Sequence, residues 1–146
     1  MIKRHELEIQ FVEFIPDSVP ERIIYISTTY ATVVHKCCCG CGAEIVTPLS
    51  PTDWKLIFDG ETVSLYPSIG NWSLACKSHY FIRENKVVWA PPMARNEIEA
   101  ARNYDAFEKE NYFRRQDSLS GSKTGAASGP DLKSTIWQKL RMFIGR

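Results

Sequence analysis

The stretch Val33–Gly42, VVHKCCCGCG, holds four of the five cysteines of this 146-residue chain within five consecutive positions. The fifth, Cys76, is followed three positions later by His79. Cysteine and histidine at such spacing are typical of a tetrahedral zinc site. Because 34 residues separate Cys41 from Cys76, a bound Zn²⁺ would join two distant parts of the chain. The sequence therefore predicts a small zinc-stabilised domain.

Disulfide bonds are the first alternative to a metal. The sequence begins MIKRHELEIQ, without the apolar segment of a secretory signal. It also lacks a run of about eighteen apolar residues that could span a membrane. We therefore expect a cytoplasmic protein with no membrane partner, and a reducing compartment rarely keeps disulfides. An odd number of cysteines would leave one unpaired, so zinc is preferred over free structural or redox cysteines.

An extended chain would give one set of metal ligands. In a strand over residues 33–41, side chains alternate between two faces, so that alternate cysteines lie together and Cys38 points away. Val33 and Val34 are typical of a strand, which favours this arrangement. The residues that would share one face are His35, Cys37, Cys39 and Cys41.

A zinc knuckle is the second arrangement of the same stretch. If the chain bends there, Cys38 and Cys41 form a Cys-x-x-Cys pair, and Gly42 suits the tight turn because it lacks a Cβ atom. In both arrangements Cys76 is a ligand, and His79 can complete the set.

Composition limits the classes of partner. The chain has 18 Lys and Arg residues against 17 Asp and Glu residues, a net charge of +1. Nucleic-acid-binding domains usually carry a clear basic excess, so we expect no nucleic-acid partner. With 44% hydrophobic residues, the chain can form the core of about one domain.

The apolar pattern predicts an α+β, mainly β fold with an antiparallel sheet. Several segments alternate apolar and polar residues or are rich in β-branched residues. Asp59-Gly60 and Glu84-Asn85-Lys86 are typical of hairpin turns. The predicted strands are residues 7–14, 22–28, 30–35, 43–47, 54–58, 61–65, 80–83 and 87–90.

One long helix is predicted over residues 96–115, after Pro91-Pro92 has ended the strands. Asn96 is the expected N-cap, and the helix is expected to cover one side of the sheet. Four apolar residues recur at a spacing of three along it. They are Ile98, Ala101, Tyr104 and Phe107.

Beyond this helix, the sequence predicts a linker and a terminal docking element. In residues 117–130, eleven of fourteen are Ser, Gly, Ala, Thr or Pro, which predicts a flexible linker. Residues 131–146 form an amphipathic pattern, typical of a tethered helix that docks on a partner or on its own domain; membrane-surface binding is a weaker third interpretation. Residues 1–116 would then be the zinc-containing, catalytic-like domain.

Residues 64–72, SLYPSIGNW, contain Pro, Gly and Asn and predict a loop near the second half of the metal site. On an extended chain, Ser78 and His79 would point to opposite faces, so His79 could activate Ser68 but not Ser78. Asn71 could donate a hydrogen bond to an oxyanion. The candidate nucleophiles and bases are Ser68, Ser78, His79 and His35.

The zinc itself has two interpretations. A catalytic zinc keeps one coordination position for water, whereas a sulfur-rich site is usually closed and structural. In the structural case, catalysis would belong to serine and histidine. From the residues alone, a purely structural zinc module remains a third interpretation.

Five separate motifs carry a resemblance to a known family. In order along the chain they are His35-x-Cys37-x-Cys39-Gly40-Cys41-Gly42, Thr47–Thr52, Phe58-Asp59-Gly60, Ser64-Leu65-x-Pro67-Ser68-Ile69-Gly70-Asn71-Trp72, and Cys76-x-Ser78-His79-Tyr80-Phe81-Ile82. Together, over residues 5–92, they resemble a bacterial domain-of-unknown-function family encoded beside genes for a ubiquitin-like protein and its E1-like and E2-like enzymes. In that setting the family's members are taken to be peptidases.

The resemblance implies a peptidase that processes or deconjugates a bacterial ubiquitin-like protein, with that protein and its E1-like and E2-like enzymes as partners. A non-catalytic zinc-stabilised module that recruits the ubiquitin-like protein is the alternative, and a hydrolase that uses zinc-activated water is a further one. The resemblance implies metal residues Cys37, Cys39, Cys41 and Cys76, and catalytic residues among Ser68, Ser78 and His79.

Overall fold

A computed structural model describes residues 6–120 of the chain. Contacts divide the chain into two compact units, Met1–Tyr112 and Phe113–Arg146. All features discussed below, except the last turns of the helix, lie in the first unit. Within residues 6–120, the single helix is too polar to cross a membrane.

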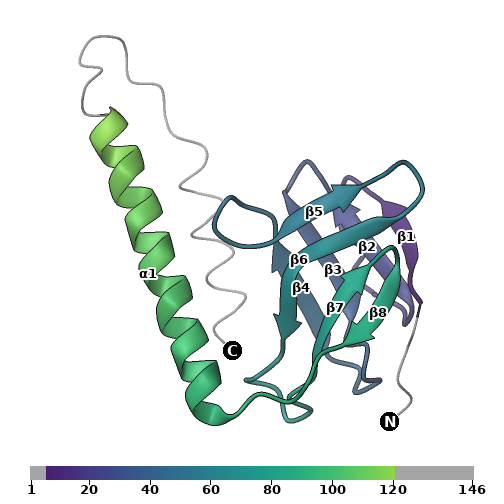
Figure 1. Cartoon of the computed structure of the whole chain (residues 1–146). Coiled ribbons are helices and arrows are strands. Elements are labelled where there is room, and N and C mark those ends of the chain that lie inside the picture. Colours follow the sequence, from purple (N-terminus) through teal and green to yellow (C-terminus); the bar gives the residue numbers. More distant parts are fainter. Residues whose placement is uncertain (1–5, 121–146) are drawn as a thin grey trace. The chain divides into compact units, whose positions relative to one another are not determined.

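Eight strands form two four-stranded sheets, so the prediction of a mainly β fold with one long helix is confirmed (Figure 1). The first sheet has the order β1-β2-β3-β4 and the second the order β5-β6-β7-β8. The strands are β1 (Glu8–Phe11), β2 (Ile23–Ser27), β3 (Thr32–Lys36), β4 (Glu44–Pro48), β5 (Lys55–Phe58), β6 (Val63–Gly70), β7 (His79–Arg83) and β8 (Lys86–Trp89).

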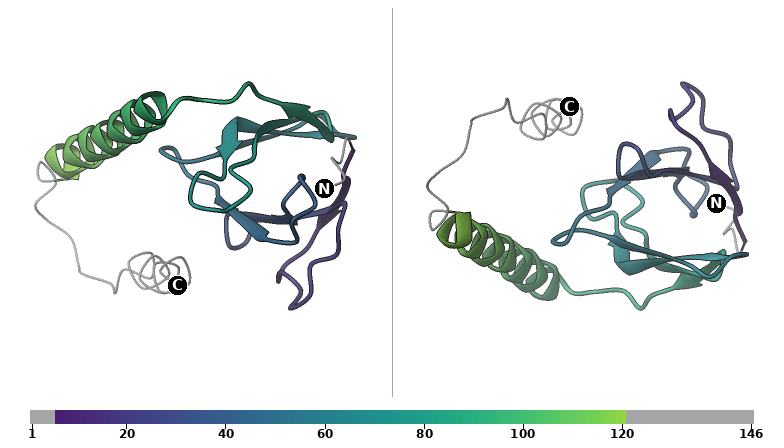
Figure 2. Two further views of the ribbon diagram at one scale, coloured as in Figure 1. Left: turned by 90° about the horizontal axis from the view of Figure 1, so that it is seen from below. Right: turned by 90° about the horizontal axis from the view of Figure 1, so that it is seen from above.

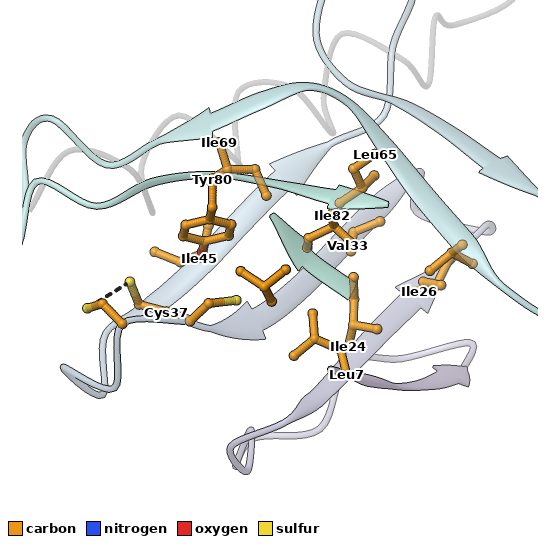
Figure 3. Close-up of a cluster of buried hydrophobic side chains, with 14 residues drawn as sticks. Leu7, Ile24, Ile26, Val33, Cys37, Ile45, Leu65, Ile69, Tyr80 and Ile82 are labelled. Carbon is orange, nitrogen blue, oxygen red and sulfur yellow. Dashed lines mark hydrogen bonds between the residues drawn. The ribbon is translucent and has the colours of Figure 1, made fainter. Parts of the chain in front are cut away.

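The two sheets lie as facing layers and enclose the core between them (Figure 2). Figure 3 shows side chains from both sheets meeting in this layer. Ile24 and Val33 of the first sheet and Leu65 and Ile82 of the second are fully buried. Burial of each such aliphatic side chain contributes about 1.5–3 kcal/mol, which is why the alternating pattern decides the fold.

The antiparallel prediction is wrong at one edge, because β1 pairs with β2 in parallel. Parallel neighbours need a long return connection, and residues 12–22 supply it. This segment is held by apolar contacts: Val12, Ile15 and Val19 pack against Tyr25 and Val34 on the outer face of the first sheet. The two prolines of this segment, Pro16 and Pro20, therefore lie in a crossover.

The predicted loop over residues 64–72 is also corrected, since β6 continues through Gly70. The pairing of β6 with β7 shifts register between Leu65 and Ile69, and the Tyr66–Pro67 peptide bond in this interval is cis. Proline is tolerated in a strand at a bulge, because no ladder hydrogen bond is needed from its nitrogen. A proline and a glycine thus lie within a strand.

Both predicted hairpins are confirmed. Asp59 Oδ1 accepts hydrogen bonds from the backbone nitrogens of Glu61 and Thr62, at 2.9 and 2.6 Å, which closes the turn between β5 and β6. Glu84 and Asn85 have φ values of 49° and 63° between β7 and β8. Positive φ at both central residues is the geometry of a type I′ turn.

The long helix is α1 (Arg95–Ser120). Its start is capped differently from the prediction: Glu97 Oε2, not Asn96, accepts a hydrogen bond from the backbone nitrogen of Ala94, at 2.7 Å. No described residue of α1 is buried, and Tyr104 and Phe107 are 67% and 59% exposed. The predicted apolar stripe therefore does not form a buried face.

The predicted linker over residues 117–130 begins inside α1, since residues 117–120 are helical. Its remainder and the predicted docking helix over residues 131–146 lie outside the described residues.

Candidate catalytic site and metal centre

Four cysteines converge where β3 ends and the segment before β7 begins. Their four Sγ atoms all lie within 4.8 Å of one another. The Sγ atom of Cys37 is 3.3 Å from that of Cys39 and 3.9 Å from that of Cys76. The residues of this cysteine cluster are Cys37, Cys39, Cys41 and Cys76.

The cluster fits a tetrahedral metal ion. Zn–S bonds are about 2.3 Å long, so the sulfur atoms of a four-thiolate site lie roughly 3.8 Å apart. The two distances from Cys37 bracket this value. Burial acts to raise the pKa of the Cys76 thiol, but hydrogen bonds with Ser78, Cys39 and Cys41 together lower it to about 7. Four sulfur donors would complete the coordination, leaving no position for a water molecule.

The chain reaches this arrangement through a turn and not through a strand. β3 ends at Lys36, and the backbone nitrogen of Gly40 donates to the carbonyl oxygen of Cys37 at 3.0 Å. Gly40 and Gly42 have φ values of 82° and 80°, which glycine adopts at little cost. The four cysteines of the alternate set therefore lie together, although the strand from which they were predicted ends before Cys37.

Cys38 and His35 face the core instead of the cluster. Cys38 is 1% exposed and packs in the core that also contains Tyr80; burial raises the pKa of its thiol to about 12. The Nε2 atom of His35 is 3.0 Å from the Tyr80 hydroxyl, and burial lowers the pKa of His35 to about 4. His35 is thus a buried neutral side chain away from both Ser68 and the cluster.

Ser78 and Asn71 lie next to Cys37 of the cysteine cluster. The Ser78 hydroxyl is 3.1 Å from Cys37 Sγ and accepts a hydrogen bond from Asn71 Nδ2 at 2.8 Å. Asn71 Nδ2 also lies 3.7 Å from Cys37 Sγ. Both residues are buried. Polar groups that contact metal ligands in this way orient the ligands and stabilise their charge.

Ser68 and His79 form a separate pair on β6 and β7. His79 Nε2 is 2.9 Å from Ser68 Oγ, and His79 Nδ1 is 3.2 Å from the carbonyl oxygen of Pro91. A carbonyl oxygen only accepts hydrogen bonds, so this contact places the proton of a neutral imidazole on Nδ1. The lone pair on Nε2 then faces the serine hydroxyl, as a general base requires.

Strand alternation keeps this pair apart from the core. Ile69 and Tyr80 point inward and are 2% and 0% exposed. Ser68 and His79, their immediate neighbours, therefore point to the outer face of the second sheet. The Trp72 ring lies 4.9 Å from the His79 ring. A Cβ atom at position 70 would overlap this indole, so Gly70 allows the indole to lie beside His79.

The Ser68–His79 pair opens into a cleft of about 390 Å³. The sheet side of the cleft is aromatic and the α1 side is partly polar, a mixture typical of ligand sites. Its lining includes Trp54, Pro67, Ser68, Trp72 and His79 from the sheet side, and Met93, Ile98, Ala101, Arg102, Asp105 and Lys109 from the segment around α1.

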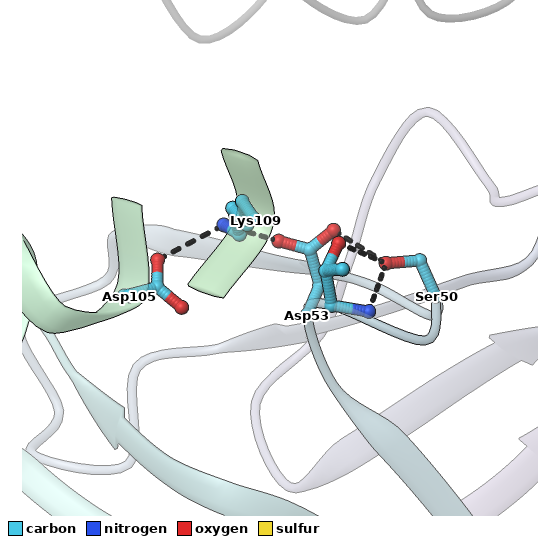
Figure 4. Close-up of polar contacts among 5 residues, drawn as sticks. Ser50, Asp53, Asp105 and Lys109 are labelled. Carbon is cyan, nitrogen blue, oxygen red and sulfur yellow. Dashed lines mark hydrogen bonds and ion pairs between the residues drawn. The ribbon is translucent and has the colours of Figure 1, made fainter. Parts of the chain in front are cut away.

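An ion pair fixes the middle of α1 beside this cleft (Figure 4). Lys109 Nζ is 2.7 Å from Asp53 Oδ1 and 3.0 Å from Asp105 Oδ2. The Ser50 hydroxyl donates to Asp53 Oδ2 at 2.6 Å. Because the Asp53 side chain is only 9% exposed, solvent screens this contact less than a surface pair.

The structure thus divides the predicted site residues into two groups. His79 lies with Ser68, and not with the cysteine cluster, while Ser78 and Asn71 lie with the cysteines. Sequence reasoning missed the Pro91 carbonyl, because a backbone acceptor has no residue-type signal. It also missed the polar cleft residues of α1, which are Arg102, Asp105 and Lys109. Two members of the predicted apolar stripe, Ile98 and Ala101, do line the cleft.

The family comparison agrees with the resemblance found in the sequence. A family model described as "Bacterial ubiquitination-like system serine protease (BubE)" matches residues 11–90, more than half of the chain. The match spans both the cysteine cluster and the Ser68–His79 pair. Neither a curated protein nor a solved structure gives a match.

Proposed function

The chain belongs to the bacterial ubiquitination-like system serine protease family, and we propose that it processes or deconjugates a bacterial ubiquitin-like protein with Ser68 as nucleophile and His79 as general base. The observation that carries the assignment is the 2.9 Å contact between Ser68 Oγ and His79 Nε2, together with the Pro91 carbonyl on Nδ1. Nucleophile, base and orienting group are all present in this arrangement.

In the first half of the reaction, Ser68 Oγ attacks the carbonyl carbon of the scissile bond. His79 Nε2 takes the hydroxyl proton, and the Pro91 carbonyl holds the imidazolium through Nδ1. The proton then passes to the leaving nitrogen as the C–N bond breaks. The products are a free amine and an ester between Ser68 and the new C-terminus.

In the second half, a water molecule attacks this ester. His79 Nε2 removes a proton from the water and returns it to Ser68 Oγ as the ester bond breaks. The free carboxylate of the processed protein leaves, and the enzyme regains its starting protonation state.

We assign the cysteine cluster a structural role and zinc as its metal. The ligands are all sulfur and equal the number that a tetrahedral site takes, which is typical of closed structural zinc. A bound zinc would supply a cross-link between the turn after β3 and the segment before β7. Through residues 76–79, this cross-link positions His79.

The partner fits the shape of the site. Ser68 and His79 lie on an open sheet face beside a cleft of about 390 Å³, which an extended peptide can enter more readily than a folded surface. The flexible C-terminal tail of a ubiquitin-like protein has this form. The E1-like and E2-like enzymes of the same system act on that tail and are further candidate partners.

The experiment uses a bacterial ubiquitin-like protein with a C-terminal extension, and mass spectrometry to follow its cleavage. We expect the wild type to remove the extension. Ser68→Ala and His79→Ala should each lower the rate at least about 10³-fold, since a triad-type site depends on each member. Brief chelation that leaves the protein folded should not stop cleavage.

Two results would favour the alternatives. If Ser68→Ala cleaves at the wild-type rate while chelation of still-folded protein stops the reaction, a metal-activated water replaces the serine. If the wild type binds the ubiquitin-like protein and cuts nothing, the chain is a recruiting module.

A further inference from the structure

A second cavity, of about 480 Å³, lies next to the catalytic cleft. It shares four lining residues with that cleft, so the two cavities adjoin. We call the two together the groove, which extends from Ser68 toward the start of α1. Cavities of about 300–1,000 Å³ hold ligands the size of a short peptide. The shared residues are Trp72, Met93, Ile98 and Arg102.

This cavity is more positive than the catalytic cleft. Lys77, Arg95 and Arg102 line it together with the single acid Glu99. Glu99 forms an ion pair with Arg95, whose Nε lies 3.1 Å from the Glu99 carboxylate. Within residues 6–120, the structure shows no ion pair for Lys77 or Arg102, which leaves two uncompensated positive charges.

The catalytic cleft has no excess of positive charge around the Ser68–His79 pair. Asp53 and Asp105 both contact Lys109, and the only other cation in its lining is Arg102, at the junction with the second cavity. Charge along the groove therefore rises from the Ser68–His79 pair toward Lys77. The second cavity is suited to a carboxylate, and Arg102 is suited to bind it through two hydrogen bonds.

We propose that the second cavity is the subsite for the leaving peptide and that Lys77 and Arg102 bind the terminal carboxylate of a short C-terminal extension. This inference rests on the proposed function. On the acyl side of the scissile bond lies the folded ubiquitin-like protein, whose chain runs through the site without a terminus. Every C-terminal extension, in contrast, ends in a carboxylate on the leaving side.

The consequence is a preference between the two reactions of the proposed function. A short extension places its terminal carboxylate within the cavity. A ubiquitin-like protein joined to a lysine of a folded target offers no such carboxylate at that distance. The groove therefore favours trimming of a short extension over release from conjugates.

The test compares extensions that differ only at the terminus. A ubiquitin-like protein is prepared with the extension Ala-Ala-Ala as the free acid, as the C-terminal amide, and as Ala-Glu-Ala amide. The full-length chain is used as wild type, as the double variant Lys77→Gln with Arg102→Gln, and as Lys55→Gln. Lys55 is an exposed lysine on β5 that lines neither cavity, so it controls for loss of positive charge.

We expect the wild type to show a KM about tenfold lower for the free acid than for either amide, with similar kcat. The double variant should lose this preference and give equal KM values for the free acid and the amide, and Lys55→Gln should match the wild type. Equal KM values for acid and amide on the wild type would overturn the proposal. If Ala-Glu-Ala amide is cleaved as efficiently as the free acid, the cavity binds a side-chain carboxylate and not the terminal carboxylate, and the proposal is wrong.

A binding measurement separates this inference from the proposed function. The peptide Ala-Ala-Ala, as free acid or as amide, is titrated into full-length Ser68→Ala and followed by NMR. We expect the free acid to bind about tenfold more tightly, and the difference to vanish when Lys77 and Arg102 are replaced. If the wild type fails to hydrolyse the extended ubiquitin-like protein, that result counts against the proposed function alone. Equal binding of both peptides to Ser68→Ala would contradict the carboxylate subsite.

Discussion

Ser78 and His79 are neighbours in the chain and belong to two different sites. Ser78 is 7% exposed and its hydroxyl lies between Asn71 and Cys37. His79, one position later, points to the opposite side and contacts Ser68 at the cleft. One step along the chain separates the surroundings of the cysteine cluster from the pair proposed to perform the chemistry.

The two sites differ in how far their polar groups are satisfied internally. Around the cysteines, hydroxyl, amide and sulfur groups contact one another in a buried network, which favours rigidity. Around Ser68, the imidazole is oriented from behind by a backbone carbonyl and its other nitrogen faces a hydroxyl beside open space. The first arrangement holds a loop in place, and the second leaves a reactive atom accessible.

The largest expected effect is loss of the cross-link in the cysteine cluster. Cys76→Ser removes one of four converging sulfurs, and structural zinc contributes on the order of 10 kcal/mol to small modules. We expect the variant to lose zinc and its cooperative unfolding transition together, as measured by elemental analysis and thermal denaturation.

Cys38→Ala is the matched control, because Cys38 is buried in the core and lies outside the cluster. It should keep one zinc per chain and lose about 1–2 kcal/mol of unfolding free energy from packing. Loss of zinc from Cys38→Ala, with retention by Cys76→Ser, would contradict the ligand assignment.

The two serines should separate stability from activity. Ser78→Ala leaves Asn71 Nδ2 and Cys37 Sγ without their shared partner, so we expect a loss of about 1–3 kcal/mol in the free energy of unfolding. Ser68→Ala should change that free energy by less than about 0.5 kcal/mol, because Ser68 faces the cleft. Urea denaturation of both variants, at fixed zinc content, measures the contrast. Equal losses in the two variants would show that Ser68 is also a structural residue.

A smaller effect is expected at Gly70, next to the catalytic pair. A methyl group there would overlap the Trp72 indole and displace it from the His79 ring. We expect Gly70→Ala to lower kcat about 10–100-fold through the orientation of His79, since small misplacements of catalytic groups have effects of this size. Zinc content should not change. Normal kcat would mean that Trp72 does not position His79.

The convergence of the four cysteines was predictable because their signal is chemical. Cys37, Cys39, Cys41 and Cys76 share a residue type and a spacing that few other functions require. The turn geometry behind that set was not predictable, since the valines before it indicate a strand and the strand ends before Cys37. The residue types indicated which side chains would converge, whereas the backbone path depended on two glycines with positive φ.

The proposed catalytic pair was only partly predictable. Ser78 and His79 do point to opposite sides, as strand alternation predicts, although Ser68 was expected in a loop that is a strand. The proline and glycine that indicated a loop lie in β6 because a register shift accommodates the proline. The role of Pro91 depends on a backbone carbonyl brought near His79 by the tertiary fold, which no local pattern encodes.

Covalent labelling tests the central assignment most directly. The wild-type chain is treated with a serine-reactive fluorophosphonate and the modified residue is located by peptide mass spectrometry. We expect one adduct, on Ser68, that forms at least about 10²-fold more slowly in His79→Ala and is unaffected by brief chelation of the folded protein. An adduct on Ser78, or no adduct on a wild type that still cleaves its substrate, would contradict the assignment of Ser68 and His79.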